Sequence, residues 1–152
     1  MDIRIHSPEV EFTLRVAALI LDQGRLLIVK HEDYDCTYTI GGKVKLNETA
    51  SEAVIRETYE ETGHLLSVDR LVFVQERFYG TEEGKHHEVT FFYLMKSNGC
   101  RMEANVCTDQ RREKLLWVPV EELEAAKLVP KFLQSALLDL TQDITHIVSR
   151  ET

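Results

Sequence analysis

The segment Thr49–Gly63 predicts a helix together with both of its ends, and no other feature constrains the fold of this chain as strongly. Thr49 and Glu52 have the spacing of a capping box, in which each side chain accepts a hydrogen bond from a backbone N–H of the other residue. Gly63 favours a stop, because glycine readily takes the left-handed backbone conformation found just past many helix ends. We therefore expect a helix at Ala50–Thr62.

The chain on either side of this helix has the composition of strands. Apolar, β-branched runs before the helix flank a turn signal at Asp22–Gly24, and further runs follow the helix. The expected strands are Phe12–Ile20, Leu26–Glu32, Leu71–Tyr79, Glu88–Lys96 and Lys114–Val120, and the later helices are Glu121–Lys127 and Pro130–Leu140. This order of elements predicts an α/β (α+β) fold in which helices pack on a sheet.

The chain of 152 residues has the length of a single domain, 1–152, and contains no internal repeat or linker-like segment. The segment Gly80–His87 carries glycines and charged residues between two expected strands, so we expect a mobile loop there. Residues 141–152 are expected to form a loosely ordered tail.

Charge limits the partners that the chain can bind. The formal net charge is −8 and the pI is near 5.2, so the sequence lacks the basic stripe with which proteins bind a long nucleic acid. An anionic substrate would be held by local cations or by a metal ion. The sequence is compatible with a homodimer but does not specify an oligomeric state.

Apolar runs and cysteines indicate the compartment. No stretch approaches the roughly 18 apolar residues that span a membrane, and no signal-peptide pattern follows Met1. The three cysteines, Cys36, Cys100 and Cys107, are odd in number and form no Cys-x-x-Cys pair. We therefore expect reduced thiols in a cytoplasmic protein.

The expected helix carries carboxylates along one side. At about 100° per residue, Glu57, Glu60 and Glu61 extend the side that begins with its apolar residues, whereas Arg56 points the other way. A solvated acidic helix with internal ion pairs is the alternative interpretation. It fits poorly, because Arg56 is the only Lys or Arg in or next to this helix.

Crowded carboxylates on one side of a helix need a nearby cation, since they otherwise repel one another or raise their pKa values. Ligands that are all oxygen suit a hard ion such as Mg²⁺ or Mn²⁺. The adjacent glycines Gly41 and Gly42 indicate unusual dihedrals or a close approach, and a main-chain carbonyl there could join the acids around the ion. Such a site suits a phosphate-rich substrate, because the metal neutralises charge and lowers the pKa of a bound water, whose proton a second carboxylate accepts.

Residues 42–64 resemble the Nudix box, Gly-x5-Glu-x7-Arg-Glu-U-x-Glu-Glu-x-Gly-U, in which U is a bulky aliphatic residue. All of its fixed positions are present at the required spacing: Gly42, Glu48, Arg56, Glu57, Glu60, Glu61 and Gly63. Thr58 and His64 stand at the two aliphatic positions and depart from the pattern. The resemblance implies the Nudix fold, a mixed β-sheet sandwiched between α-helices, over most of the chain.

The resemblance also implies a chemistry, the Mg²⁺- or Mn²⁺-dependent hydrolysis of the diphosphate linkage in a nucleoside diphosphate joined to a group X. The metal ligands that it implies are Gly42 (through its carbonyl), Glu57, Glu60 and Glu61. The catalytic residues that it implies are Glu57, Glu60, Arg56 and Glu48, with Arg56 paired to Glu48 so that the loop is held against the helix. The general base stays open among Glu57, Glu60 and a glutamate outside the box, such as Glu103 or Glu113.

Substrate-binding residues are expected on both sides of the box. Lys43 and Lys45, in the loop before the helix, are candidates for phosphate contacts. Tyr79 and Phe91 could stack on a base and His87 could reach a phosphate, because alternate strand residues face opposite sides of a sheet. Core packing is the alternative for the aromatic residues, and simple surface exposure is the alternative for the histidine and the lysines.

Three functions are compatible with these residues. The first is hydrolysis of a small nucleotide, with a nucleotide sugar or a nucleoside triphosphate as the expected substrate. The second is hydrolysis of a dinucleoside polyphosphate or of an RNA 5′ end, and the acidity of the chain argues against a long RNA. The third is a non-catalytic nucleotide-binding module, which would be expected to have lost acids of the box, whereas this chain retains all of them.

Overall fold

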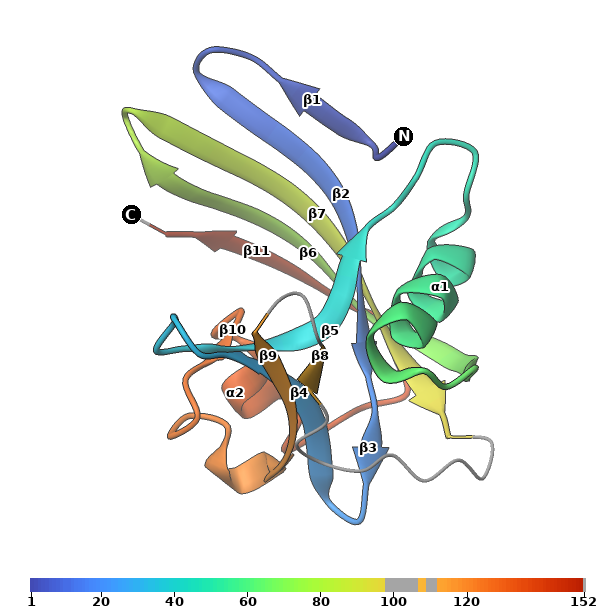
Figure 1. Ribbon diagram of the computed structural model, residues 1–152. Helices are drawn as coiled ribbons and strands as arrows, with labels where there is room; N and C mark the ends of the chain where they lie inside the picture. Colours follow the sequence, from blue (N-terminus) through green and yellow to red (C-terminus); the bar gives the residue numbers. More distant parts are fainter. Residues whose placement is uncertain (98–106, 109–111, 152) are drawn as a thin grey trace.

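The computed structural model describes residues 1–97, 107–108 and 112–151 (Figure 1). Within these residues, eleven strands form one mixed sheet with the order β11-β6-β7-β2-β5-β4-β9-β8, while β1, β3 and β10 pair with β2, β4 and β5. The strands are β1 (Arg4–His6), β2 (Val10–Leu19), β3 (Leu21–Asp22), β4 (Arg25–His31), β5 (Thr37–Lys43), β6 (Ser67–Thr81), β7 (Gly84–Lys96), β8 (Cys107–Thr108), β9 (Glu113–Pro119), β10 (Leu128–Val129) and β11 (Thr145–Arg150).

Strand directions in the sheet are mixed. β2 runs parallel to β7, β6 to β11 and β5 to β10, and the other pairs are antiparallel. β5 joins the two halves of the sheet, since its end at Gly41 and Gly42 pairs with β2 and its start at Tyr38 and Thr39 pairs with β4. The glycine pair of the Nudix box therefore lies in the middle of the sheet.

Helix α1 (Ala50–Thr62) has the predicted bounds. Thr49 and Glu52 form the predicted capping box, and Gly63 takes a φ of 76° just past the last turn. Because a residue with a side chain rarely adopts this φ, the glycine ends the helix where the sequence indicated. The loop between β5 and α1 is short, so the helix starts close to the glycine pair.

Helices cover both faces of the sheet (Figure 1). α1 packs on one face, over a core that includes Val16, Leu27 and Val54. The short helices η1 (Val120–Glu122) and α2 (Leu133–Ala136) lie on the other face, over a core that includes Phe73, Phe92 and Leu128. The predicted arrangement of a mixed sheet between helices is therefore confirmed. No helix within the described part of the chain is long and apolar enough to cross a membrane.

The mobile loop expected at Gly80–His87 is instead mostly strand. β6 and β7 both extend into it and leave only residues 82–83 between them. Gly80 takes a φ of 107°, and a Cβ on it would lie 2.2 Å from the carbonyl oxygen of Gly84, so the glycine permits a close crossing of the two strands. Glycines and charges are typical of loops, but pairing across the hairpin overrides this local preference.

Three expectations for the C-terminal part were also wrong. The loosely ordered tail expected at 141–152 contains β11, which pairs in parallel with β6. The helix expected at Pro130–Leu140 is reduced to α2, and the helix expected at Glu121–Lys127 is reduced to η1 followed by turns. Apolar residues of both helical segments still pack into the core. Their spacing therefore indicated which side is buried, but not the number of helical turns.

Candidate active site

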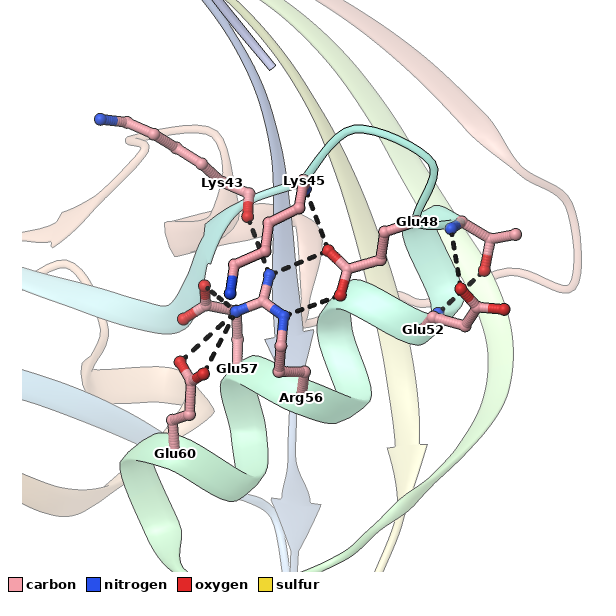
Figure 2. A network of polar contacts seen from close by, with 8 residues as sticks. Lys43, Lys45, Glu48, Glu52, Arg56, Glu57 and Glu60 are labelled. Carbon is pink, nitrogen blue, oxygen red and sulfur yellow. Dashed lines mark hydrogen bonds and ion pairs between the residues drawn. The ribbon is translucent and has the colours of Figure 1, made fainter. Parts of the chain in front are cut away.

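Arg56 is the centre of a polar network between α1 and the loop before it (Figure 2). Its Nε donates a hydrogen bond to Oε2 of Glu48 at 2.7 Å, and its Nη2 donates to Oε1 of the same carboxylate at 2.9 Å. Nη2 also donates to the carbonyl oxygen of Lys43 at 3.1 Å, and the backbone N–H of Lys45 donates to Glu48 at 3.0 Å. The predicted pairing of Arg56 with Glu48 is confirmed, and it ties the loop to the helix.

The same guanidinium contacts two of the acids on α1. Nη1 of Arg56 donates to Oε1 of Glu57 at 2.9 Å and lies 3.4 Å from both carboxylate oxygens of Glu60. The prediction that Arg56 points away from these acids was therefore wrong. A helical wheel gives only the direction in which a side chain leaves the helix, whereas the long arginine side chain bends back to reach the residue four positions on.

Electrostatics keep the Arg56–Glu48 pair ionised. Hydrogen bonds from Arg56 are the main reason that the pKa of Glu48 is lowered from 4.5 to about 2, although burial opposes this shift. The pKa of Arg56 is raised, first by its hydrogen bond to Glu48. At neutral pH, Glu48 is thus an ionised carboxylate and a very weak base. It binds the guanidinium of Arg56, so any effect on a reaction comes from positioning Arg56.

Gly41 and Gly42 permit two close approaches. A Cβ on Gly42 would lie 2.4 Å from the carboxylate of Glu57, and a Cβ on Gly41 would lie 2.1 Å from the carbonyl oxygen of Val16. Neither glycine takes a positive φ. The sequence indicated either unusual dihedrals or a close approach for this pair, and close approach is the reason that applies. Gly42 leaves room for the Glu57 carboxylate at the end of β5.

The acids of α1 offer a hard set of ligands, but they do not form a ready-made metal cage. Within the described ranges, no three His, Cys, Asp or Glu side chains are placed to hold a metal ion together. Glu60 is 48% exposed and its contacts with Arg56 are long, so its side chain can turn without losing a strong hydrogen bond. Carboxylate oxygens are the donors that Mg²⁺ and Mn²⁺ prefer, so the residues fit such an ion by their chemistry once Glu60 turns away from Arg56.

The two lysines expected to contact phosphate flank the network. In Figure 2 the side chain of Lys43 extends away from the acids, while its carbonyl oxygen accepts a hydrogen bond from Arg56. Lys45 is exposed, and its backbone N–H binds Glu48. Their backbone groups thus help to fix the loop, and the phosphate contacts of their side chains stay predictions.

A hollow with a volume of about 250 Å³ opens on the sheet beside Gly41. Its walls come from β2, β5, β6, β7 and the end of β10. Their polar and aromatic side chains include Arg15, Gln75, Arg77, Tyr79 and Glu88. The volume is below the roughly 300–1,000 Å³ of pockets that enclose most of a drug-sized ligand. The hollow therefore suits one moiety of a larger substrate.

Tyr79 lines this hollow, as a substrate-binding residue should, but its ring is already in contact with other groups. The centroids of the Tyr79 and His86 rings are 4.7 Å apart. The guanidinium carbon of Arg77 lies 4.1 Å from the centroid of the Tyr79 ring. Its hydroxyl donates to Glu88 at 2.8 Å, and its pKa is raised, mainly by burial. Tyr79 thus contributes a protonated hydroxyl held by Glu88, and stacking on a base is not the contact that this arrangement favours.

The structure brings neither Phe91 nor His87 into the hollow. Phe91 packs against the core under α1, which is the alternative considered for the aromatic residues. It lies between Thr90 and Phe92, which line the hollow, and so its side chain faces the other side of the sheet. The ring of His87 stacks on Phe78 with centroids 4.4 Å apart, and its contact with a phosphate stays a prediction.

Apart from Tyr79, the polar residues of the hollow were not predicted from the sequence, and they include Arg15, Gln75, Arg77 and Glu88. Strand alternation was the available signal, because Gln75 and Arg77 share one side of β6 with Tyr79. In the sequence, Gln75 interrupts the apolar start of the run Leu71–Tyr79, and the structure shows that its side chain is only 1% exposed.

Several other expectations concern residues outside the box. Of the two glutamates considered there as the general base, Glu103 lies outside the described residues, and Glu113 lies in β9 opposite His31 of β4. Cys36 is a free thiol, as expected, whereas Cys100 lies outside the described residues.

Comparison with known proteins shows the family and supports the fold. The family model of the NUDIX domain matches residues 11–138, which is most of the chain. The chain therefore belongs to the Nudix family. Members of this family generally use divalent metal ions and act on small nucleotide substrates.

Individual relatives share parts of the sequence or the fold. A MutT-like protein of Streptomyces ambofaciens is 34% identical over 68 residues, and this match spans 45% of the chain but less than half, 44%, of that protein. The crystal structure of a mutator MutT protein from Bacillus halodurans aligns with a TM-score of 0.63 at 19% identity, over 88% of this chain and 89% of that one. An ADP-ribose pyrophosphatase from Streptococcus suis aligns with a TM-score of 0.55 at 15% identity, over 92% and 99% of the two chains. Both structures share the fold of this chain.

Proposed function

We propose that this protein hydrolyses the diphosphate linkage of a nucleoside diphosphate joined to a group X, with a nucleotide sugar or a nucleoside triphosphate as its substrate. The proposal rests on one adjacency in β5. Gly41 lines the hollow, and the next residue, Gly42, faces the carboxylate of Glu57. The hollow and α1 lie on opposite sides of the sheet, so a nucleoside held in the hollow would extend its phosphates past the glycine pair of β5 to reach the acids of α1.

Mg²⁺ or Mn²⁺ is the proposed cofactor, held by the carboxylates of Glu57, Glu60 and Glu61 and by the carbonyl of Gly42. When bound, such an ion neutralises phosphate charge and lowers the pKa of a coordinated water. Arg56 donates a 2.9 Å hydrogen bond to Glu57. The carboxylate of Glu57 is therefore oriented before the substrate arrives. Lys45, in the loop before the helix, and Lys43, at the end of β5, are the proposed sources of positive charge for the phosphates, and the side chain of Lys43 would have to turn towards the acids to contribute.

Glu57 and Glu60 are the proposed acceptors of the proton of the attacking water. Glu48 is not suited to this role, because Arg56 lowers its pKa to about 2. Glu60 is the more accessible of the two, with a side chain that is 48% exposed against 12% for Glu57. Glu60 can therefore move between Arg56 and the reacting groups, whereas the hydrogen bond from Arg56 orients the carboxylate of Glu57 more closely.

A small substrate is favoured over an RNA end or a non-catalytic role. The net charge of −8 opposes a long polyanion. All acids of the box are retained, and Arg56 contacts three of them, Glu48, Glu57 and Glu60. A module that only binds nucleotides would not require this arrangement.

The test is a panel of nucleoside triphosphates, nucleotide sugars and dinucleoside polyphosphates, each incubated with Mg²⁺, with Mn²⁺ or with excess EDTA. Products are separated by chromatography, and phosphate is measured with and without an added phosphatase. Cleavage of a diphosphate linkage in a nucleotide sugar should yield phosphate only after the phosphatase is added, since its products are monoesters. Turnover that is unchanged in EDTA, or no turnover across the whole panel, would refute the proposal.

A further inference from the structure

The C-terminal strand β11 supports one wall of the hollow. It pairs in parallel with β6, with Ile147 beside Gln75 and Ser149 beside Arg77. It also lies outside residues 11–138, the part of the chain that matches the family model. Side chains alternate along this strand, so that Ser149 is half-buried while its neighbour Val148 is 56% exposed.

Two side chains from this end of the chain bind the two polar residues of β6 that line the hollow. Nε2 of Gln75 donates a hydrogen bond to Oγ of Ser149 at 3.1 Å. Nε of Arg77 donates to Oε2 of Glu151 at 2.8 Å. The backbone N–H of Glu151 donates to the carbonyl oxygen of Phe78 at 2.8 Å, so Glu151 is itself held by β6.

Arg77 is held from several sides. In addition to Glu151, its Nη1 lies 3.9 Å from the carboxylate of Glu88 across the strand pair. Its guanidinium lies over the ring of Tyr79, and the side chain is only 18% exposed. A planar cation fixed in this way presents its remaining N–H donors in set directions.

We infer that Ser149 and Glu151 are positioning residues that determine which nucleobase the hollow accepts. The inference rests on the proposed function, because it requires that a nucleoside enters the hollow. An amide offers both a donor and an acceptor and a guanidinium offers donors only, so Gln75 and Arg77 together can address the hydrogen-bonding edge of a base. A site built from oriented polar groups discriminates strongly between ligands, because the wrong ligand leaves those groups unpaired.

The substitutions Ser149→Ala and Glu151→Gln test the inference, with Val148→Thr as the matched control on the exposed side of the same strand. Isothermal titration calorimetry measures the dissociation constants of AMP, GMP, CMP and UMP for the wild type and each variant. KM and kcat are measured with the best substrate of the panel. Circular dichroism and thermal unfolding check that each variant is folded.

We expect each substitution to weaken the preferred monophosphate about tenfold, which corresponds to about 1.4 kcal/mol, and to reduce the preference among bases by a similar factor. KM should rise with the dissociation constant, while kcat stays within about twofold, because the acids of α1 are untouched. Ser149→Thr keeps a hydroxyl and should restore most of the preference. Val148→Thr should behave like the wild type.

Unchanged base preference in both folded variants would overturn the inference, as would an equal loss in Val148→Thr. It would also be overturned if the wild type bound none of the four monophosphates. A wild type that binds them with a base preference but hydrolyses nothing in the panel would refute the proposed function alone. The binding data on the variants would then still decide the role of Ser149 and Glu151.

Discussion

Arg56 and Glu48 are joined by two parallel hydrogen bonds, from Nε to Oε2 at 2.7 Å and from Nη2 to Oε1 at 2.9 Å. The side chains are 22% and 15% exposed, so water screens this pair less than it screens an ordinary surface ion pair. Glu48 belongs to the loop and Arg56 to the helix. Ionised Glu48 therefore helps to hold the loop beside the acids of α1, together with backbone hydrogen bonds from Val44 to Leu14 and from Leu46 to Met1.

The first prediction is that this pair makes stability depend on acid pH. The pKa of Glu48 is lowered from 4.5 to about 2 in the folded protein. Its ionised form therefore stabilises the fold fully above the unfolded pKa, and this stabilisation is lost as the pH falls towards the folded pKa. The shift corresponds to about 3 kcal/mol at neutral pH. Urea unfolding of the wild type and of Glu48→Gln should show a difference that closes as the pH falls.

Glu52→Gln is the control for this titration, because glutamine also serves as the N3 residue of a capping box. Its stability should follow that of the wild type through the same pH range. A difference between the wild type and Glu48→Gln that is as large at about pH 2 as at neutral pH would contradict the role assigned to Glu48.

Gly42→Ala should lower activity while leaving the fold intact. The new Cβ would lie 2.4 Å from the carboxylate of Glu57, and this flexible group can move away from it. Because displacement of a reacting group by about 1 Å can cost about 100-fold in rate, we expect a loss of that order in kcat/KM. Thermal unfolding should change little.

Gly41→Ala provides the contrast for Gly42→Ala. Its Cβ would lie 2.1 Å from the backbone oxygen of Val16, where no side chain can move out of the way. We expect a loss of about 1–3 kcal/mol in the free energy of unfolding, as for overpacked cores. Equal destabilisation by the two alanines would argue against this difference between the glycines.

Thr58→Val should stabilise the protein without changing its activity. The side chain of Thr58 is fully buried, and its hydroxyl finds no hydrogen-bond partner among the described residues. Leaving such a group buried costs about 1–3 kcal/mol, and valine has nearly the same shape. Urea unfolding should therefore show a gain of about 1 kcal/mol or more.

Thr62→Val is the matched control for Thr58→Val, because its hydroxyl is used. Oγ1 of Thr62 donates to the carbonyl oxygen of Thr58 at 2.7 Å and accepts a hydrogen bond from the N–H of His64 at 3.1 Å. This substitution should destabilise the fold. A loss of stability in Thr58→Val would show that its hydroxyl is satisfied in solution.

Glu60→Gln and Glu61→Gln should each cut turnover by at least about 100-fold, because a glutamine neither accepts the proton of water nor binds a divalent ion strongly. Glu52→Gln, on the same helix, should keep wild-type turnover. Circular dichroism should be unchanged in all three. Wild-type activity in both Glu60→Gln and Glu61→Gln would remove the acids of α1 from the mechanism.

Local sequence was sufficient to predict α1 and its loop. The capping box at Thr49, the stop at Gly63 and the pairing of Arg56 with Glu48 all join residues that are near one another in the chain. Such contacts depend on short-range geometry that spacing alone describes. The direction of the Arg56 side chain was missed, because spacing says nothing about how a long side chain bends.

The hollow could not be predicted in the same way. β6 and β7 form a hairpin, but the remaining polar side chains reach the hollow only because β2 pairs with β7 and β11 pairs with β6, over long distances in sequence. Segment 141–152 is short and flanked by polar residues, and its mostly β-branched run at Ile144–Val148 becomes a strand by pairing with β6. The role of Ser149 and Glu151 therefore became visible only once the order of the strands was known.

A single peptide unit of β5 separates Gly41, at the hollow, from Gly42, at the acids. For the proposed enzyme, the side chains that select a substrate thus come from β6 and β11, and the side chains that react with it come from α1. The two properties are open to separate engineering. A library that varies positions 75, 77, 149 and 151 can be selected for a new nucleotide while every residue of the Nudix box is held constant.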